Sequence, residues 1–446
     1  MNDLRPIRQS AAPGRRRAFA AVAAPLQAFF GLEAASGIVL LACAVAALAW
    51  ANLAPHGYHA VFATPIVVGL GGHVLAFSVA ELVNDGLMTV FFAVVGMEIK
   101  RELVHGELRT ARQAILPLVA AAGGMIAPAL IYTAWNAGGP GAPGWGIAMA
   151  TDIAFCIGVL TLLGRRVPRA LVVFVTALAI FDDIGGILVI ALFYGSGIHA
   201  PWLLAALALV AVAVAAGRAH VRSPFAWTAL AAAIWGALHA AGIHATLAGV
   251  VIGFAVPARP RRPLREVFRE LAAHASLLAR AAADEGRDEE AASAIEERLE
   301  ELEAPLTRFI HALHPWVAFG VMPLFALANS GVTLAALERS QLLGSVAVGT
   351  AVALFLGKQA GIFAFTFGAV RLGLAPMPRE ASWGKLLGVS IVAGIGFTVA
   401  LFIAGLAFPE DPRLLDEAKV GILVGSLVSG LVGAAVLRAT GERVGA

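Results

Sequence analysis

The stretch ALVVFVTALAIFDDIGGILVIALFY, residues 170–194, decides the kind of protein that this sequence makes. Its only charged side chains are two adjacent carboxylates at its centre, Asp182 and Asp183. About 20 mainly apolar residues suffice for a helix to cross a bilayer. A charged side chain in the middle of such a helix costs about 2.5–3.5 kcal/mol on insertion scales. The stretch therefore predicts a membrane helix that carries two acids for function.

The composition of the whole chain also indicates a membrane protein. Of its 446 residues, 59% are hydrophobic and 14% are charged, whereas soluble domains are about 45–50% apolar and about 25% charged. This balance argues against a soluble enzyme. Both cysteines, Cys43 and Cys156, lie in apolar runs, which argues against a disulfide framework or a cysteine metal cluster. The formal net charge of +3 gives no reason to expect nucleic acid as a partner.

Apolar runs of this kind recur from residue 32 onward, and we interpret each as a transmembrane helix. The fold class expected is an all-α polytopic membrane protein with about 12 transmembrane helices. The seventh and eighth runs are short. The alternative for these two runs is that together they form one hairpin with a tight connection. The segment 56–76 contains several glycines with Val67 and Val68, which predicts a short external hairpin. The runs lie at residues 32–51, 77–99, 114–135, 145–163, 170–194, 201–217, 224–240, 243–256, 311–328, 345–370, 386–408 and 420–437.

Charge asymmetry supports an even number of crossings. Lys and Arg concentrate in cytoplasmic loops, and nearly all 32 basic residues fall there if the N-terminus is inside. The exceptions are Arg339, Arg413 and Lys419 in opposite loops and Lys358 within a span. We expect a multi-pass protein of the bacterial inner membrane with cytoplasmic N- and C-termini. Because more spans follow the first, the first is not a removable signal peptide.

The chain is expected to divide into five segments. The polar insertion among them has apolar residues at helical spacing, which predicts an amphipathic helical hairpin. The simplest interpretation is a solvated extension without chemistry, and the alternative is a regulatory or partner-binding element. The segments are a cytoplasmic N-terminal tail at 1–31, helices one to eight at 32–263, the cytoplasmic charged insertion at 264–305, helices nine to twelve at 306–437, and a cytoplasmic C-terminal tail at 438–446.

Two further charged residues lie near the middle of spans, Asp152 in the fourth and Lys358 in the tenth. Asp182 and Asp183 are about 100° apart on one helix and should have different partners. Crowded carboxylates in a low dielectric repel unless a proton or a cation enters. Protons and a hard cation such as Na+ would then compete for them, with Thr151 as an extra oxygen ligand. Lys358 is able to lose its proton, unlike an arginine; a static Asp–Lys pair that ties two helices is the alternative.

Two spans carry signs of an interruption. The fourth is rich in glycine before residues 150–152, and the eleventh contains Gly394, Gly396 and Thr398 in its middle. Broken helices in corresponding positions of two halves point to a transporter binding site, because freed helix ends offer dipoles and carbonyls to ions. The alternative is that these glycines serve helix packing.

The end of the second span carries a cluster of charges, Glu98, Arg101 and Glu102. The two acids are one helical turn apart, so their titration is a candidate pH sensor. The alternative is a set of local ion pairs at a helix end. Asp85, near the other end of the same span, is equally open to both interpretations.

Together these motifs closely resemble the NhaA family of bacterial Na+/H+ antiporters. The resemblance covers residues from about 30 to 437, apart from the polar insertion. It is carried by FF at 91–92 up to Glu102, ATDIAF at 150–155, AIFDDIG at 179–185, HATLAG at 244–249, HPW at 314–316, GK at 357–358 and GIGFT at 394–398.

This resemblance implies an inverted repeat with two interrupted helices that cross at mid-membrane. It implies that Asp183 is the principal cation carboxylate and that Asp182 is the partner of Lys358. It further implies that Asp152 and Lys358 compensate the charges of the facing helix ends, with Thr151 beside them.

The resemblance also implies an activity. Cytoplasmic Na+ or Li+ would be exchanged for external protons, with more protons entering than sodium leaving, and with pH activation through Glu98, Arg101 and Glu102. Two departures from the family's pattern concern the region linked to pH sensing. One is the insertion at 264–305, and the other is Ile310, at a position that is acidic in some relatives and precedes His311 and His314. We expect these two histidines at the membrane interface rather than in a metal site.

We therefore expect a secondary active transporter and no enzyme, with no cofactor. Its partners would be Na+, Li+, H+ and the lipid bilayer. The candidate oligomeric state is a homodimer. A sodium-coupled symporter of an organic solute is the nearest alternative, but it would need a larger polar cavity. An intramembrane aspartyl protease using Asp152 and Asp183 is disfavoured by Lys358 and by the lack of a Gly-x-Gly-Asp element. A structural scaffold would leave the buried charges unexplained.

Overall fold

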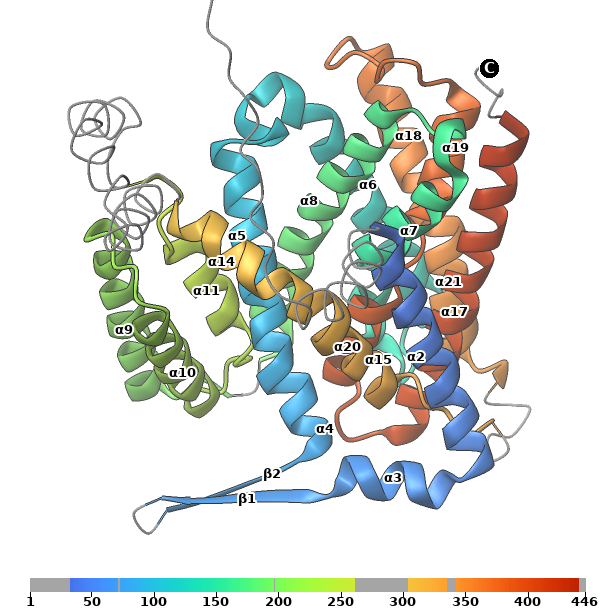
Figure 1. Cartoon of the computed structure of the whole chain (residues 1–446). Helices are drawn as coiled ribbons and strands as arrows, with labels where there is room; N and C mark the ends of the chain where they lie inside the picture. Colours follow the sequence, from blue (N-terminus) through green and yellow to red (C-terminus); the bar gives the residue numbers. More distant parts are fainter. Residues whose placement is uncertain (1–32, 71–72, 196, 261–303, 335–341, 441–446) are drawn as a thin grey trace, which may run out of the picture.

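The computed structural model describes residues 33–70, 73–195, 197–260, 304–334 and 342–440. Long helices form one bundle, and a two-stranded β-hairpin projects from one end (Figure 1). The predicted N-terminal tail, most of the predicted charged insertion and the C-terminal tail from residue 441 onward lie outside the described residues, so the five-segment division stays a prediction.

The bundle is built mainly of helices that match the apolar runs of the sequence. These helices include α2 (Glu33–Leu53), α3 (Pro55–Ala63), α5 (Met88–Val104), α6 (Ala111–Trp135), α8 (Arg169–Phe193), α9 (Ala200–Arg218), α10 (Pro224–Ala240), α11 (Leu247–Ala255), α14 (Pro305–Trp316), α15 (Met322–Asn329), α17 (Ser345–Val352), α18 (Lys358–Arg371) and α21 (Pro412–Thr440). Short or π-helical turns join them: α4 (Val79–Glu81), η1 (Leu82–Leu87), η2 (Glu107–Arg109), η4 (Gly164–Arg166), η5 (Val317–Val321) and η7 (Ala353–Gly357).

All twelve expected runs contain helix, but fewer are long enough to span a membrane. Among the described residues, nine helices qualify by length and composition, and a tenth qualifies if the bent pair α19 and α20 counts as one span. The seventh and eighth runs correspond to α10, with 17 residues, and α11, with 9. The polytopic helical fold is confirmed, and the count of twelve crossings stays a prediction.

The expected external hairpin forms directly after α3. β1 (Pro65–Leu70) pairs with β2 (His73–Ser78) in antiparallel register, from Pro65 opposite Ser78 to Leu70 opposite His73. The strand β1 includes two adjacent valines, whose branched side chains favour extended backbone. The chain then enters α4 through a capping box, in which the Ser78 hydroxyl accepts from the Glu81 backbone and the Glu81 carboxylate accepts from the Ser78 backbone.

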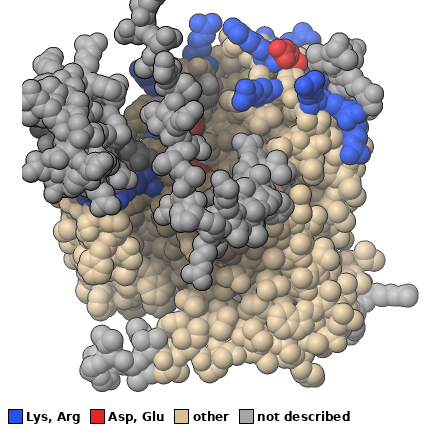
Figure 2. Space-filling model, in the orientation of Figure 1, with Lys and Arg blue, Asp and Glu red and all other residues tan. Residues whose placement is uncertain are grey.

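The surface is divided between an apolar flank and a basic end. Large apolar side chains are exposed on the outer helices, as at Leu130, Leu192, Leu204 and Leu431, which are each at least 64% exposed. So much exposed apolar surface is unfavourable in water and suits the hydrocarbon of a bilayer. Lys and Arg gather mainly at the end opposite the β-hairpin (Figure 2), where the connections α5–α6 and α18–α19 lie (Figure 1).

Two interrupted helices cross inside the bundle. The first consists of the 3-10 helix η3 (Ala142–Met149), an extended stretch and α7 (Ile153–Leu163). The second consists of α19 (Trp383–Val392), a four-residue break and α20 (Phe397–Ala407), with a bend of 46°. The breaks bond to each other, because the Asp152 amide donates to the Ile395 carbonyl at 2.7 Å. Backbone that leaves a helix at membrane depth must find such partners within the protein.

Close packing of α6 against α18 places Lys358 at the centre. Gly357 and Gly361 of α18 and its preceding turn lie against Pro128 and Gly123 of α6; a Cβ built on Gly357 would be 2.7 Å from the Pro128 Cα. Such contacts between small residues bring two membrane helices together. Lys358 directly follows the π-helical turn η7, a type of distortion that is frequent at functional sites.

The break between α19 and α20 leads to a prediction at Gly394. A Cβ at this position would lie 2.6 Å from the Ser429 hydroxyl and 2.7 Å from the Leu354 carbonyl, whereas a Cβ at Gly405 on α20 meets nothing within 4 Å. Gly394→Ala is therefore expected to cost about 1–3 kcal/mol of stability through overpacking. Thermal unfolding in detergent checks this, with Gly405→Ala as the matched control. Equal unfolding temperatures for the two variants would contradict the tight fit at the break.

Candidate functional site

Asp152 lies where the N-termini of two helices meet. It is the N-cap of α7, and its carboxylate accepts the Phe155 amide at 3.1 Å. Its other oxygen accepts the Thr398 amide at 3.1 Å and the Thr398 hydroxyl at 2.5 Å, both from the first turn of α20. Because helix N-termini carry partial positive charge, one buried carboxylate compensates both of these ends.

Lys358 lies at the C-terminal end of η3, the helical segment that precedes the first break. Its ammonium donates to the carbonyl of Met149, the last residue of η3, and to the Asp182 carboxylate at 2.7 Å. The C-terminal end of α19 has donors of its own. The Thr151 hydroxyl lies 3.0 Å from the Ala393 carbonyl, and the Cys156 thiol lies 3.2 Å from the Val392 carbonyl. Cations and donors thus face the ends at which partial negative charge gathers.

The pair Lys358–Asp182 is fully buried, with neither side chain accessible. The Thr151 hydroxyl also lies 2.6 Å from the Asp182 oxygen that Lys358 contacts. The second Asp182 oxygen has no hydrogen-bond partner among the described residues. One oxygen of Asp182 is therefore saturated while the other is available to a ligand.

Asp183 follows on α8 and faces a different environment. Its residue is 6% exposed, and it makes no hydrogen bond or ion pair within the described ranges of the chain. The prediction that the two adjacent aspartates have different partners agrees with this arrangement, since only Asp182 contacts Lys358. A buried carboxylate without a fixed partner must either bind a proton or take up a cation.

The structure does not gather the three aspartates into a preformed metal cluster. Within the part of the chain that it describes, no three His, Cys, Asp or Glu side chains converge as a metal site. Asp152 uses both of its oxygens at the helix N-termini, as set out above. Cation binding by Asp183, Asp182, Thr151 and Asp152 stays a prediction. The two residues differ in their partners, because Asp152 is hydrogen-bonded through both oxygens and Asp183 makes no hydrogen bond among the described residues.

The charge cluster at the end of α5 has a partner on another helix. The His314 ring nitrogen Nδ1 of α14 lies 3.1 Å from the Glu98 carboxylate. Arg101 and Glu102 approach each other at 3.8 Å. Asp85 lies apart from this cluster, in the π-helical turn η1 at the opposite end of the same span. The structure thus joins Glu98 to a histidine for which the sequence predicted only an interfacial position.

The sequence-based prediction missed several groups that belong to the site. The Met149 carbonyl is one, and Ser426 of α21 is another, whose hydroxyl accepts the Phe397 amide at 3.3 Å at the start of α20. A small polar residue in the last apolar run was the available signal for Ser426. No signal for a particular backbone carbonyl exists in the sequence, because every residue carries one.

A helical membrane protein in which two broken helices cross at buried charges has the architecture of a secondary transporter. A family model described as Na+/H+ antiporter 1 matches residues 27–437. The chain belongs to this family. The resemblance inferred from the motifs is thereby confirmed.

Curated relatives match over nearly the full chain. The Na(+)/H(+) antiporter NhaA of Anaeromyxobacter sp. (strain Fw109-5) is 66% identical over 95% of this chain and 93% of its own length. The Na(+)/H(+) antiporter NhaA 1 of Myxococcus xanthus (strain DK1622) is 57% identical over 94% of both chains. The Na(+)/H(+) antiporter NhaA of Rhodospirillum rubrum is 45% identical over 93% of this chain and 98% of its own.

The buried pair gives a stability prediction. Lys358→Ala leaves the Asp182 carboxylate buried without its countercharge, which typically costs about 3–5 kcal/mol. The double variant Lys358→Ala with Asp182→Asn removes both charges and should recover part of this loss. Thermal unfolding of the two variants and the parent checks it. If the double variant is no more stable than Lys358→Ala, the loss of stability does not come from the unpaired charge.

Proposed function

We propose that this chain exports cytoplasmic Na+ or Li+ in exchange for external protons, with Asp183 as the principal cation carboxylate. The observation that carries the proposal is the contrast between two adjacent acids. Asp182 is held by Lys358 and Thr151, whereas Asp183 is buried without a partner in the described residues. Membership of the antiporter family supports Na+ and H+ as the ions exchanged.

Competition for the same oxygens couples the two ions. A cation at Asp183 would draw on the free oxygen of Asp182 and on the Thr151 hydroxyl nearby. A proton on Asp183 removes the charge that holds the cation. When the cation enters, Asp182 turns away from Lys358. The second proton leaves from whichever member of the pair holds it, either the Lys358 ammonium or Asp182 in its carboxylic acid form. Two protons for one Na+ make the exchange electrogenic.

The crossing of the two interrupted helices supports alternating access. The helix ends are compensated by Asp152 and Lys358 from within the protein, so a small movement of the segments around the breaks can expose the site to one side at a time. Asp152 keeps its helix N-termini together through this movement, while the Lys358–Asp182 contact opens and closes.

The contact between Glu98 and His314 is the proposed element of pH activation, together with Arg101, Glu102 and, more remotely, Asp85. A histidine changes its charge in the physiological pH range. Protonated His314 forms an ion pair with Glu98 across α5 and α14, and neutral His314 does not. Loss of the ion pair as pH rises would release α5 for activity.

The basic end in Figure 2 supports a location in the bacterial inner membrane with this end in the cytoplasm. The first described turn of α2 and the last turn of α21 both point toward that end (Figure 1), which supports cytoplasmic termini. A homodimer in the lipid bilayer belongs to the same proposal.

Removing the Asp183 charge tests the proposal directly. Proteoliposomes that hold a pH gradient receive Na+, Li+ or K+, and proton flux is followed with a fluorescent probe. Na+ and Li+ should dissipate the gradient with the parent protein, and Asp183→Asn should show no flux above empty vesicles because its cation carboxylate is gone. Glu410→Gln, which neutralises an exposed acid outside the site, serves as the matched control.

The outcomes separate the alternatives. Normal cation-dependent flux from Asp183→Asn would remove this residue from the site. A folded parent protein that gives no proton flux with Na+ or Li+ at any pH would instead favour a symporter, and a screen of organic solutes would follow.

Replacing the histidine tests the pH element. His314→Gln cannot become charged, so the variant is expected to remain active at a more acidic pH than the parent, with a similar maximal rate. The measurement is the rate of Na+-driven proton flux across the pH range. An unchanged pH profile would show that the Glu98–His314 contact is structural only.

A further inference from the structure

The 3-10 helix η3 is an element that needs support from its neighbours. It runs for eight residues, Ala142–Met149. Runs of 3-10 helix longer than three or four residues are uncommon, because their hydrogen bonds have poorer geometry than those of an α-helix. η3 also contains Gly144 and Gly146, and glycine weakens a helix further. Its position in the bundle therefore depends on contacts with other helices.

Two tyrosines provide such contacts at the start of η3. The Tyr132 hydroxyl of α6 donates to the Gly141 carbonyl at 2.8 Å. The Tyr194 hydroxyl, directly after α8, donates to the Pro143 carbonyl at 2.8 Å. Gly141 is the N-cap of η3, and Pro143 lies in its first turn. The helices α6 and α8 thus both hold the start of η3 through a phenol.

The two glycines of η3 leave space for these phenols. A Cβ built on Gly144 would overlap the Tyr132 hydroxyl, and a Cβ built on Gly146 would lie 2.9 Å from the Tyr194 hydroxyl oxygen. The sequence indicated only that glycines in this span mark an interruption or serve helix packing. The structure matches each of the two glycines to one tyrosine hydroxyl.

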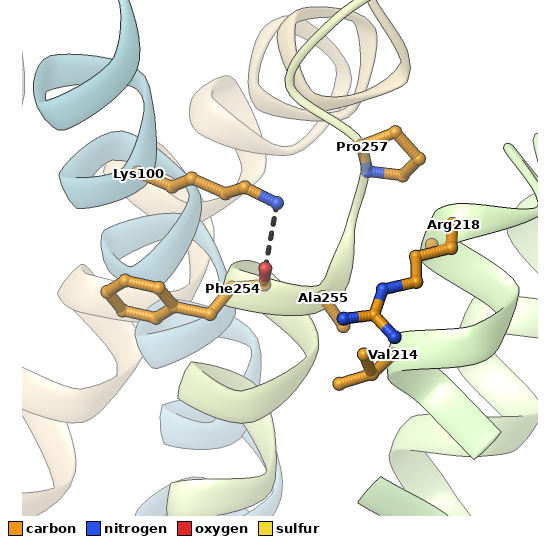
Figure 3. A pocket seen from close by; sticks show the side chains of 7 residues that line it. Lys100, Val214, Arg218, Phe254, Ala255 and Pro257 are labelled. Carbon is orange, nitrogen blue, oxygen red and sulfur yellow. Dashed lines mark hydrogen bonds between the residues drawn. The ribbon is translucent and has the colours of Figure 1, made fainter. Parts of the chain in front are cut away.

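A tyrosine hydroxyl holds a carbonyl without adding a charge. Elsewhere in the bundle a cation holds a helix end, because the Lys100 ammonium donates to the Phe254 carbonyl near the end of α11 at 2.8 Å (Figure 3). A further cation on η3 would add to the electrostatic field at the buried acids. The phenols fix the start of η3 and leave the charge balance between Lys358 and Asp182 unchanged.

The other end of η3 leads into the site. The carbonyl of Met149, its last residue, accepts from the Lys358 ammonium. Two residues later, the Thr151 hydroxyl lies 2.6 Å from the Asp182 carboxylate. The position of η3 therefore determines where the Met149 carbonyl and the Thr151 hydroxyl lie relative to the buried pair.

We propose that Tyr132 and Tyr194 are positioning residues for cation binding, which act by holding η3 in place at its start. This inference rests on the function proposed above. With both hydroxyls present, Thr151 is held where a cation can use its oxygen together with the acids. Without them, η3 is free to shift, and the cation loses a preorganised ligand.

Removing the hydroxyls alone tests this role. Tyr132→Phe and Tyr194→Phe keep the rings and lose the bonds to η3. The Na+ concentration for half-maximal proton flux in proteoliposomes should rise about threefold for each variant and about tenfold for the double variant, as expected for the loss of one and of two hydrogen bonds. The maximal rate should change less, because the buried charges all remain.

Tyr58→Phe is the matched control, since it removes the hydroxyl of the third tyrosine in the chain. The Tyr58 hydroxyl donates at 2.8 Å to the carbonyls of Leu327 and Ala328, near the end of α15, and both lie outside the interrupted helices. This variant should keep the half-maximal Na+ concentration of the parent. A loss of stability alone would lower the maximal rate through the folded fraction and would not change that concentration.

Hydrogen exchange measures the anchoring of η3 without transport. Peptides that cover residues 141–149 should exchange their amides faster in the double variant than in the parent, because local opening becomes easier. The same peptides in Tyr58→Phe should exchange at the rate of the parent.

Three outcomes would overturn the proposal. One is an unchanged half-maximal Na+ concentration in the double variant. Another is an equal rise in Tyr58→Phe, which would assign the effect to a general loss of stability. The third is unchanged exchange at residues 141–149 in the double variant, which would show that the hydroxyls do not hold η3. A folded parent without Na+-driven flux would instead overturn the proposed function, and with it any role of the tyrosines in exchange.

Discussion

Four helix ends that face one another inside the bilayer set the conditions for the rest of this structure. Each break frees amides and carbonyls that no water can satisfy at that depth. Part of the solution is backbone to backbone, between Asp152 and Ile395. The remainder needs charge, and Asp152 supplies it to the N-termini while Lys358 supplies it to the Met149 carbonyl.

This requirement gives the three buried acids different hydrogen-bond partners. Asp152 is committed to two helix N-termini, and Asp182 shares one oxygen with Lys358 and Thr151. Asp183 makes no hydrogen bond or ion pair in the described chain. A paired carboxylate and an unpaired one therefore occupy adjacent positions on α8 within the described chain. This supports the proposal that a cation arriving at Asp183 perturbs the pair that ties α8 to α18.

Packing around the crossing keeps these charges in place. Glycines between α6 and α18 allow Lys358 to reach the centre, and Ser426 of α21 caps the start of α20.

The sequence by itself determined the class of protein, the apolar runs, the buried charges and the two breaks. These are local properties, because the cost of placing a charge in a bilayer depends on the residues of one segment. Only the tertiary structure decided which atoms meet. Asp152 contacts Thr398, and Glu98 contacts His314, across more than 200 residues of chain in each case. Such pairings depend on how helices pack, and no pattern within a single run contains that information.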